Sequence, residues 1–286
     1  MDNILELVGI SHLYGKGTPF EKTALNNVNI GFKRGRITGL IGHTGSGKST
    51  LISLLNGLTR PTTGTVLLNN NDIWQKPKEI ASVRFKVGLV MQYPEYQLFD
   101  ETVRLDIGYA PRNLGLSKDE IDARVNEAAR FAGIDEALMD SSPFELSGGQ
   151  KRRVAIAGVI AMHPDVLVLD EPAAGLDPKG RREILTGLRH FADEKGTTII
   201  LVSHSMEDMA YYCDDVVVMN HGEIAMSGTV GEVFSQAEKM AEYGLDVPEV
   251  SKIAHRLVSA GIKLEGELYT VDGVKNAILK YIGGGK

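Results

Sequence analysis

The stretch that decides the fold is Gly42-His43-Thr44-Gly45-Ser46-Gly47-Lys48-Ser49, which matches the phosphate-binding pattern G-x-x-x-x-G-K-S/T. It lies between an apolar run, residues 36–42, that predicts a buried strand and a segment, residues 48–58, that predicts a helix. Glycines let backbone N–H groups turn inward around a phosphate, and the helix N-terminus adds positive potential there. Lys48 is expected to bridge β- and γ-phosphates, and Ser49 to hold Mg²⁺. An ordinary glycine-rich turn, the alternative, leaves the flanking strand and helix unexplained.

Composition and charge restrict the class of protein. The chain has 286 residues, of which 43% are hydrophobic and 24% charged, enough for a sizeable core and too apolar for a disordered chain. The net charge of −6 disfavours non-specific binding to nucleic acid. A single cysteine, Cys213, excludes an internal disulfide framework and is typical of a reducing compartment. The longest apolar run, 154–162, is about half of what a membrane-spanning helix needs, and residues 1–20 lack the features of a signal peptide. We therefore expect a soluble, intracellular protein.

The order of apolar runs predicts an α/β fold with a mostly parallel sheet. Strands are expected at residues 36–42, 86–91, 165–169 and 197–202, with polar ends and many β-branched residues. A stretch that is mainly helical, from about residue 95 or 100 to 163, interrupts this alternation. Within it, Ser117-Lys-Asp-Glu120 has capping-box spacing and is expected to open a helix that runs to about Ala132. We interpret the stretch as a helical subdomain inserted into the core, which also carries an N-terminal antiparallel β-subdomain.

The last third of the chain predicts a boundary near residue 230. Residues 215–219 and 223–226 flank Asn220-His221-Gly222 and are expected to form a hairpin. Residues 1–230 are assigned to one nucleotide-binding domain and 231–286 to a small α/β extension. In the extension we expect a helix from Pro248 to about Ala260, a strand at 267–271, and a helix capped by Asp272 that runs to Ile282.

Two carboxylates follow one of the buried strands. In Val166-Leu-Val-Leu-Asp170-Glu171-Pro172 they lie at the carboxyl edge of the sheet, where α/β proteins bind ligands. Asp170 is suited to the outer coordination shell of Mg²⁺, and Glu171 is within reach of a water molecule in line with a γ-phosphate. Alone, the sequence could equally be a turn that caps the edge of the sheet. The phosphate-binding loop elsewhere in the chain favours the catalytic interpretation.

A second anion-binding helix end is predicted at Leu146-Ser147-Gly148-Gly149-Gln150, which precedes a helix from Lys151 to about Met162, with Ser147 as its N-cap. This pentapeptide closely resembles the signature of the ATP-binding cassette family. In that family it contacts the γ-phosphate of ATP held by the phosphate-binding loop of another subunit. The resemblance therefore implies a site that is complete only in a dimer, with ATP and Mg²⁺ as cofactors.

The resemblance covers about residues 3–230, with the family's motifs in order. Tyr14 matches the aromatic residue that stacks on adenine, although Phe20 lies close enough in sequence to compete for this role. Considered singly, Tyr14, Gln92, Asp177 and His204 each have an ordinary structural explanation; their common order favours the family. The resemblance assigns nucleotide binding to Tyr14, Gly42, Thr44, Gly45, Ser46, Gly47, Lys48, Ser49 and Thr50; the signature to Ser147, Gly148, Gly149 and Gln150; Mg²⁺ to Ser49, Gln92 and, in the outer shell, Asp170; catalysis to Gln92, Glu171 and His204; and communication across the dimer to Asp177.

A narrower resemblance points to the ATPases of energy-coupling factor (ECF) importers. It rests on residues 92–99 (QYPEYQLF), on residues 17–21 (GTPFE), which resemble one of two ATPase paralogues, and on residues 150–158 (QKRRVAIAG). Ala173 departs from the Thr usual in the family after Glu-Pro, which is not expected to abolish activity. Residues 93–99 suit a groove for helices of a membrane subunit, or else pack ordinarily between subdomains. The extension resembles one that adds dimer contacts, and a passive helical cap is its alternative.

The resemblance implies an ATPase that drives uptake of vitamins or metal ions from the cytoplasmic face of the cell membrane, as a peripheral subunit. Its implied partners are a paralogous ATPase in a heterodimer, a transmembrane coupling subunit and a substrate-binding membrane subunit, with no nucleic acid. One alternative is a soluble cassette protein that acts on ribosomes or DNA, which usually carries two cassettes or long coiled coils. Another is a small-molecule kinase, for which residues 146–150 have no use. The transported molecule cannot be predicted.

Overall fold

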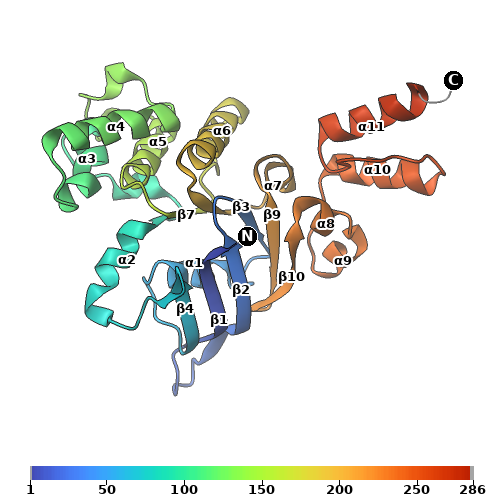
Figure 1. Ribbon diagram of the computed structural model, residues 1–286, viewed down its shortest axis with the longest axis horizontal. Helices are drawn as coiled ribbons and strands as arrows, with labels where there is room; N and C mark the ends of the chain where they lie inside the picture. The colour runs from blue at the N-terminus through green and yellow to red at the C-terminus, as the bar shows by residue number, and fades with distance from the viewer. Residues whose placement is uncertain (1, 284–286) are drawn as a thin grey trace.

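The computed structural model describes residues 2–283, and its N-terminal part is an antiparallel sheet (Figure 1). The strand order is β2-β1-β4-β5, and every pair is antiparallel. This confirms the expected N-terminal β-subdomain. The strands are β1 (Asn3–Tyr14), β2 (Lys22–Lys33), β4 (Thr63–Leu68) and β5 (Asn71–Asp72).

A second sheet has the order β10-β9-β3-β8-β7-β6 and forms the centre of the molecule. All its neighbours are parallel except β10, which pairs with β9 as the predicted hairpin. Every residue of β3 and β8 is buried, as expected for aliphatic strands covered on both faces. The strands are β3 (Ile37–Ile41), β6 (Val87–Val90), β7 (Val166–Asp170), β8 (Thr198–Val202), β9 (Asp215–Asn220) and β10 (Glu223–Thr229).

Two apolar cores lie on the two faces of this parallel sheet. In β7, Leu167 and Leu169 belong to one core and Val166 and Val168 to the other, because successive side chains of a strand point in opposite directions. One core joins the sheet to α1 and to the antiparallel sheet, and the other joins it to the helical subdomain. The helices outside that subdomain are α1 (Lys48–Leu55), the short 3₁₀ turn η1 (Pro77–Glu79), α2 (Ile80–Lys86), α6 (Pro178–Lys195) and α7 (Met206–Tyr212).

The inserted helical subdomain was predicted correctly and lies to one side of the sheet (green in Figure 1). Ser117 and Glu120 form the predicted capping box at the start of α4. The helix after the signature begins at Gly148, three residues before the predicted Lys151, because a second capping box joins Ser147 to Gln150. The elements are η2 (Pro94–Gln97), α3 (Val103–Asn113), α4 (Lys118–Ala132), η3 (Glu136–Leu138), η4 (Pro143–Glu145) and α5 (Gly148–Ile160).

The C-terminal extension is helical, so the predicted α/β character was wrong. Residues 262–270 lie within the described part of the chain and contain no strand. A strand there needs a sheet edge to pair with; instead Thr270 Oγ1 accepts a hydrogen bond from Gly273 N at the start of α11. Asp272, the predicted cap, instead lies 3.4 Å from the Tyr211 hydroxyl of α7. The helices are α8 (Val230–Phe234), α9 (Ala237–Glu242), α10 (Glu249–Ser259) and α11 (Val271–Gly283).

The last two helices, α10 and α11, lie on the opposite side of the sheet from the helical subdomain (Figure 1). The predicted helix from Pro248 to about Ala260 is confirmed by α10. The boundary at residue 231 stays a prediction. Among residues 2–283, none of the helices combines the length and the apolar character that crossing a bilayer requires.

Candidate nucleotide-binding site

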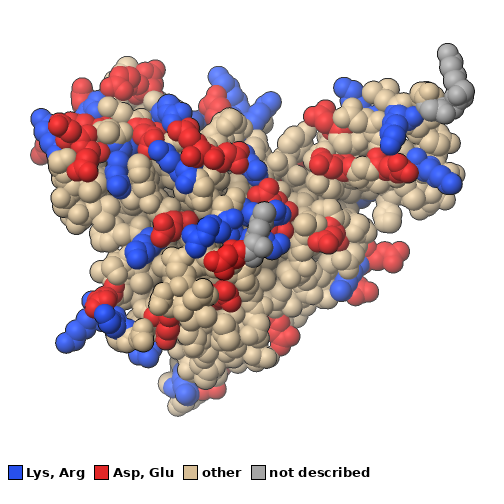
Figure 2. Space-filling model, viewed as in Figure 1, with Lys and Arg blue, Asp and Glu red and all other residues tan. Residues whose placement is uncertain are grey.

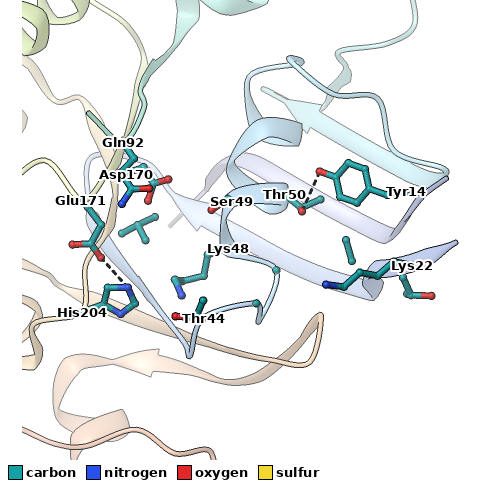
Figure 3. Close-up of a pocket in the computed structure, with 15 residues that line it drawn as sticks. Tyr14, Lys22, Thr44, Lys48, Ser49, Thr50, Gln92, Asp170, Glu171 and His204 are labelled. Carbon is teal, nitrogen blue, oxygen red and sulfur yellow. Dashed lines mark hydrogen bonds and ion pairs between the residues drawn. The ribbon is translucent and has the colours of Figure 1, made fainter. Parts of the chain in front are cut away.

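A pocket of about 350 Å³ opens between the carboxyl edge of the parallel sheet and the antiparallel sheet (Figure 3). The ends of β7 and β8 and the start of α1 meet here, as expected where parallel strands end together. The pocket collects most of the residues that the sequence predicted for nucleotide binding and catalysis. Its lining is Tyr14, Lys22, Thr23, Ala24, Thr44, Gly45, Gly47, Lys48, Ser49, Thr50, Gln92, Asp170, Glu171, Val202 and His204.

The glycine-rich loop has the backbone that the sequence predicted. Gly47 has a φ of 107°, and a Cβ there would lie 2.8 Å from the carbonyl oxygen of Ala24. A side chain at this position would therefore be strained and also crowded. Gly42 and Ser46 do not line the pocket, since they form its rear support: the Ser46 carbonyl accepts a hydrogen bond from Gly222 N. Their contact with nucleotide stays a prediction. What the structure shows is that they pack behind the loop and support it.

The Lys48 ammonium points into the mouth of this loop. It donates to the carbonyl oxygens of Gly42 at 2.6 Å and His43 at 3.1 Å. Burial lowers the pKa of Lys48, and the carboxylates of Glu171 and Asp170 partly oppose this effect. A buried ammonium that faces the open end of the loop can exchange these neutral acceptors for phosphate oxygens.

The acidic pair lies opposite, at the end of β7. Glu171 adopts a φ of 52° and donates its backbone N–H to the Val202 carbonyl at 3.0 Å. A left-handed conformation at a side chain of this size is strained and is often found at functional sites. Its side chain is mostly buried, 14% exposed, and its Oε1 accepts no hydrogen bond from residues 2–283. That oxygen is thus available to a water molecule or a substrate.

Burial and the neighbouring Asp170 carboxylate raise the pKa of Glu171 to about 7, although Lys48 acts in the opposite direction. Burial also raises the pKa of Asp170. His204 Nε2 lies 3.5 Å from Glu171 Oε1, and burial together with Lys48 lowers the pKa of this imidazole (Figure 3). A carboxyl group that titrates near neutrality is well matched to general-base catalysis.

Three oxygen donors in the pocket fit the predicted Mg²⁺ site. Ser49 stands in the first turn of α1, Asp170 ends β7, and Gln92 faces the pocket from the segment after β6. Hydroxyl, amide and carboxylate oxygens are ligands that Mg²⁺ accepts, and the three side chains supply one of each kind. Gln92 lies beyond Val90, the last residue of β6, so the prediction that it ends a strand is corrected by two residues.

The geometry favours Tyr14 over Phe20 as the adenine-stacking residue. Tyr14 lines the pocket, its Oη lies 3.3 Å from Thr50 Oγ1, and its ring packs edge-on against His12. Phe20 is 87% exposed and lies outside the lining. Sequence reasoning missed the pocket wall formed by Lys22, Thr23 and Ala24. These residues reach the pocket because Lys22 pairs with Tyr14 across β1 and β2.

The signature and Asp177 lie outside this pocket. Ser147 is exposed, and its side chain and that of Gln150 close the capping box at the start of α5. Gly148 and Gly149 follow in the first turn. Asp177 caps α6, accepting a hydrogen bond from Gly180 N at 2.7 Å. The chain therefore has two separate helix N-termini, those of α1 and α5, where the sequence predicted them. Anion binding at each stays a prediction.

Residues 25–174, just over half of the chain, match the family model described as ABC transporter. The chain belongs to this family. Its similarity to the energy-coupling factor transporter ATP-binding protein EcfA2 of Clostridium perfringens is 52% identity over 279 residues, covering 97% of this chain and 98% of that one. The EcfA2 protein of Clostridioides difficile is 50% identical over 277 residues, with 96% of each chain covered.

Solved structures agree with this assignment. CbiO1 of Clostridium perfringens, described as part of the ABC transporter complex cbiONQ, has a TM-score of 0.76 at 40% identity and covers 90% of this chain and all of its own. The cassette MJ0796, solved as a dimer with ADP and phosphate, has a TM-score of 0.71 at 28% identity and covers 79% of this chain and 98% of its own. The chain is thus an ABC ATPase of the ECF group, which confirms both resemblances.

Proposed function

We propose that this chain hydrolyses ATP as the motor of an ECF-type importer, in a site completed by a second ATPase subunit. The observation that carries the proposal is the pocket that brings Lys48 and Glu171 together, a buried ammonium opposite a carboxyl group that is mostly buried. Phosphoryl transfer needs a cation at the phosphates and a group that positions the attacking water. The pocket provides both from one chain.

In this proposal Lys48 leaves the carbonyl groups of the loop and binds the β- and γ-phosphates, while Tyr14 stacks on the base. Glu171 accepts a proton from the attacking water through Oε1, which accepts no hydrogen bond from residues 2–283. His204, whose Nε2 lies 3.5 Å from that oxygen, contacts the γ-phosphate. Ser49, Gln92 and Asp170 would hold Mg²⁺, and the ion would supply positive charge to neutralise the phosphates when it is bound. The strained backbone of Glu171 holds the carboxylate in place, so little reorganisation is needed during the reaction.

The remaining donors come from a partner. Ser147 and Gly149 are exposed or half-exposed at the start of α5, where backbone N–H groups and the helix dipole favour an anion. We propose that they contact ATP bound to the partner subunit, and that Asp177 in the nearby loop joins the same interface. The cassette MJ0796, solved as a dimer, supports such pairing. In this proposal the partner is a paralogous ATPase in a heterodimer, and ATP favours the closed form.

An exposed aromatic surface next to Gln92 suits the membrane partner. Tyr96 is 84% exposed and Phe99 57%, and the Phe99 ring packs edge-on against Tyr109. Such exposure argues against ordinary packing between core and subdomain as the role of this segment. We propose that helices of a transmembrane coupling subunit dock here, with a separate substrate-binding membrane subunit. The chain is then a peripheral subunit at the cytoplasmic face, in a system that imports vitamins or metal ions.

The extension is the second proposed contact between ATPase subunits. On α10 and α11, Ile253, Leu279 and Ile282 are all more than half exposed. Apolar side chains gathered on two neighbouring helices favour an interface over a passive cap. We keep residue 231 as the proposed start of this element.

The ribosome- or DNA-directed alternative is less well supported. On the face shown in Figure 2, acidic and basic side chains are interspersed over the helical subdomain and the C-terminal helices, without a basic stripe. Nucleic-acid binding depends on such a stripe. The deciding experiment is affinity purification from detergent-solubilised membranes, followed by identification of the bound subunits and measurement of ATPase activity. A membrane complex with a second ATPase supports the proposal, whereas recovery with ribosomes or DNA overturns it.

A further inference from the structure

One buried arginine on α5 joins three segments that the sequence keeps far apart. Arg152 is 5% exposed. Its Nε and Nη2 donate to Glu95 Oε2 at 3.1 Å and Oε1 at 2.8 Å, a bidentate pair, and its Nη1 donates to the carbonyl oxygen of Ala174. All three contacts use the planar fork of the guanidinium group, which fixes the relative positions of the three segments.

Each segment has a part in the proposed function. Glu95 lies in η2, between Gln92 and the exposed aromatic rings that are proposed to meet the membrane subunit. Ala174 closes a tight turn that begins at the catalytic carboxylate, since its N–H donates to the Glu171 carbonyl at 3.2 Å. Arg152 itself belongs to the helix that starts with the signature. A single side chain therefore touches the docking segment, the signature helix and the Glu171 turn.

These contacts hold Arg152, Glu95 and the Ala174 carbonyl in fixed positions relative to one another. Although burial opposes it, the hydrogen bonds from Arg152 keep the pKa of Glu95 below its ordinary value, so the carboxylate is charged. Removing either partner leaves the other charge buried and unpaired. The ion pair between Arg130 of α4 and Glu194 of α6 is different, because both of its side chains are about half exposed to solvent.

We propose that Arg152 is a positioning residue that couples the aromatic docking surface to Glu171. A shift of η2 on contact with the membrane subunit moves Glu95, the guanidinium follows its bidentate partner, and the Ala174 carbonyl carries the displacement to the Glu171 turn. The inference rests on the proposed function and adds to it the route by which the membrane subunit controls hydrolysis. Arg152 does not touch substrate in this scheme.

The test compares Arg152→Lys and Glu95→Gln in the complex purified with its co-expressed membrane subunits. A lysine ammonium cannot hold both Glu95 oxygens and the Ala174 carbonyl together, and glutamine keeps the shape of Glu95 without its charge. For both variants we expect kcat to fall about tenfold or more through displacement of Glu171, while the KM for ATP changes by less than about threefold. The double variant should be no worse than the single ones, since both break one pair.

Arg130→Gln is the matched control. It breaks a solvent-exposed ion pair between α4 and α6 and should leave kcat and its stimulation by the membrane subunits unchanged. The inference is overturned if Arg152→Lys retains wild-type kcat, if the two defects add, or if lost activity merely follows a lowered melting temperature. Failure of the proposed function looks different, because the wild-type ATPase would then gain no stimulation from any membrane subunit.

Discussion

The pH dependence of ATP hydrolysis is a sensitive test of Glu171 as the general base. Burial and the Asp170 charge raise its pKa to about 7 from 4.5, and the group acts as a base only when ionised. With this pKa, about 9% of the molecules carry the carboxylate at pH 6 and about 91% at pH 8, so kcat/KM for ATP should rise about tenfold between these values. A carboxyl group with an ordinary pKa would be ionised at both, and the rate would stay flat.

The assay is steady-state phosphate release by the purified complex, with ATP varied from below to above its KM and Mg²⁺ kept in excess over ATP at every pH. Binding of a fluorescent ATP analogue, measured over the same range, separates the titration of the enzyme from that of the nucleotide. Since kcat/KM reports groups of the free enzyme, its midpoint should lie near pH 7. A flat profile, or a midpoint below about pH 5 with intact binding, would refute the role given to the buried carboxylate.

Three further outcomes follow from the same geometry. Lys48→Ala removes the ammonium from the loop and should abolish binding of the fluorescent ATP analogue; retained affinity would contradict its place at the phosphates. Ser147→Arg should leave analogue binding intact but reduce hydrolysis by the complex by at least about a hundredfold, and unchanged turnover would rule out a shared site. Glu171→Gln removes a carboxyl whose pKa is higher in the folded state than in the unfolded one, so the wild type loses stability as the pH rises from about 4.5 to 7. The loss is about 3 kcal/mol, so the substitution should raise the melting temperature by roughly 5–10 °C at pH 8 and hardly change it at pH 4.5; an equal increase at both would contradict the burial argument.

The parts of the site that sequence could predict are those fixed by neighbours along the chain. The loop from Gly42 to Ser49 carries its own backbone geometry, and Asp170 and Glu171 follow directly from the end of a strand. Because parallel strands end at one edge, these two segments could be expected to meet. Local capping also predicted Ser117 and Ser147 correctly, since each box is closed within four residues.

The parts that sequence missed depend on contacts between distant segments. Lys22 and Ala24 line the pocket only because β2 pairs with β1 in an irregular register that no local pattern encodes. Glu95 and Arg152 are separated by 57 residues. The strand wrongly predicted at 267–271 has the same cause. Local β propensity does not make a strand without pairing to a neighbouring one, and residues 267–270 form no strand in this structure.

The rate of hydrolysis per subunit as a function of subunit concentration tests the central claim, that two chains complete each site. The chain is diluted alone and then titrated with its partner ATPase while phosphate release is followed. The rate should be negligible for the dilute single chain and should rise to a plateau as pairs form. Full activity per chain at the lowest dilution, independent of the partner, would contradict the account.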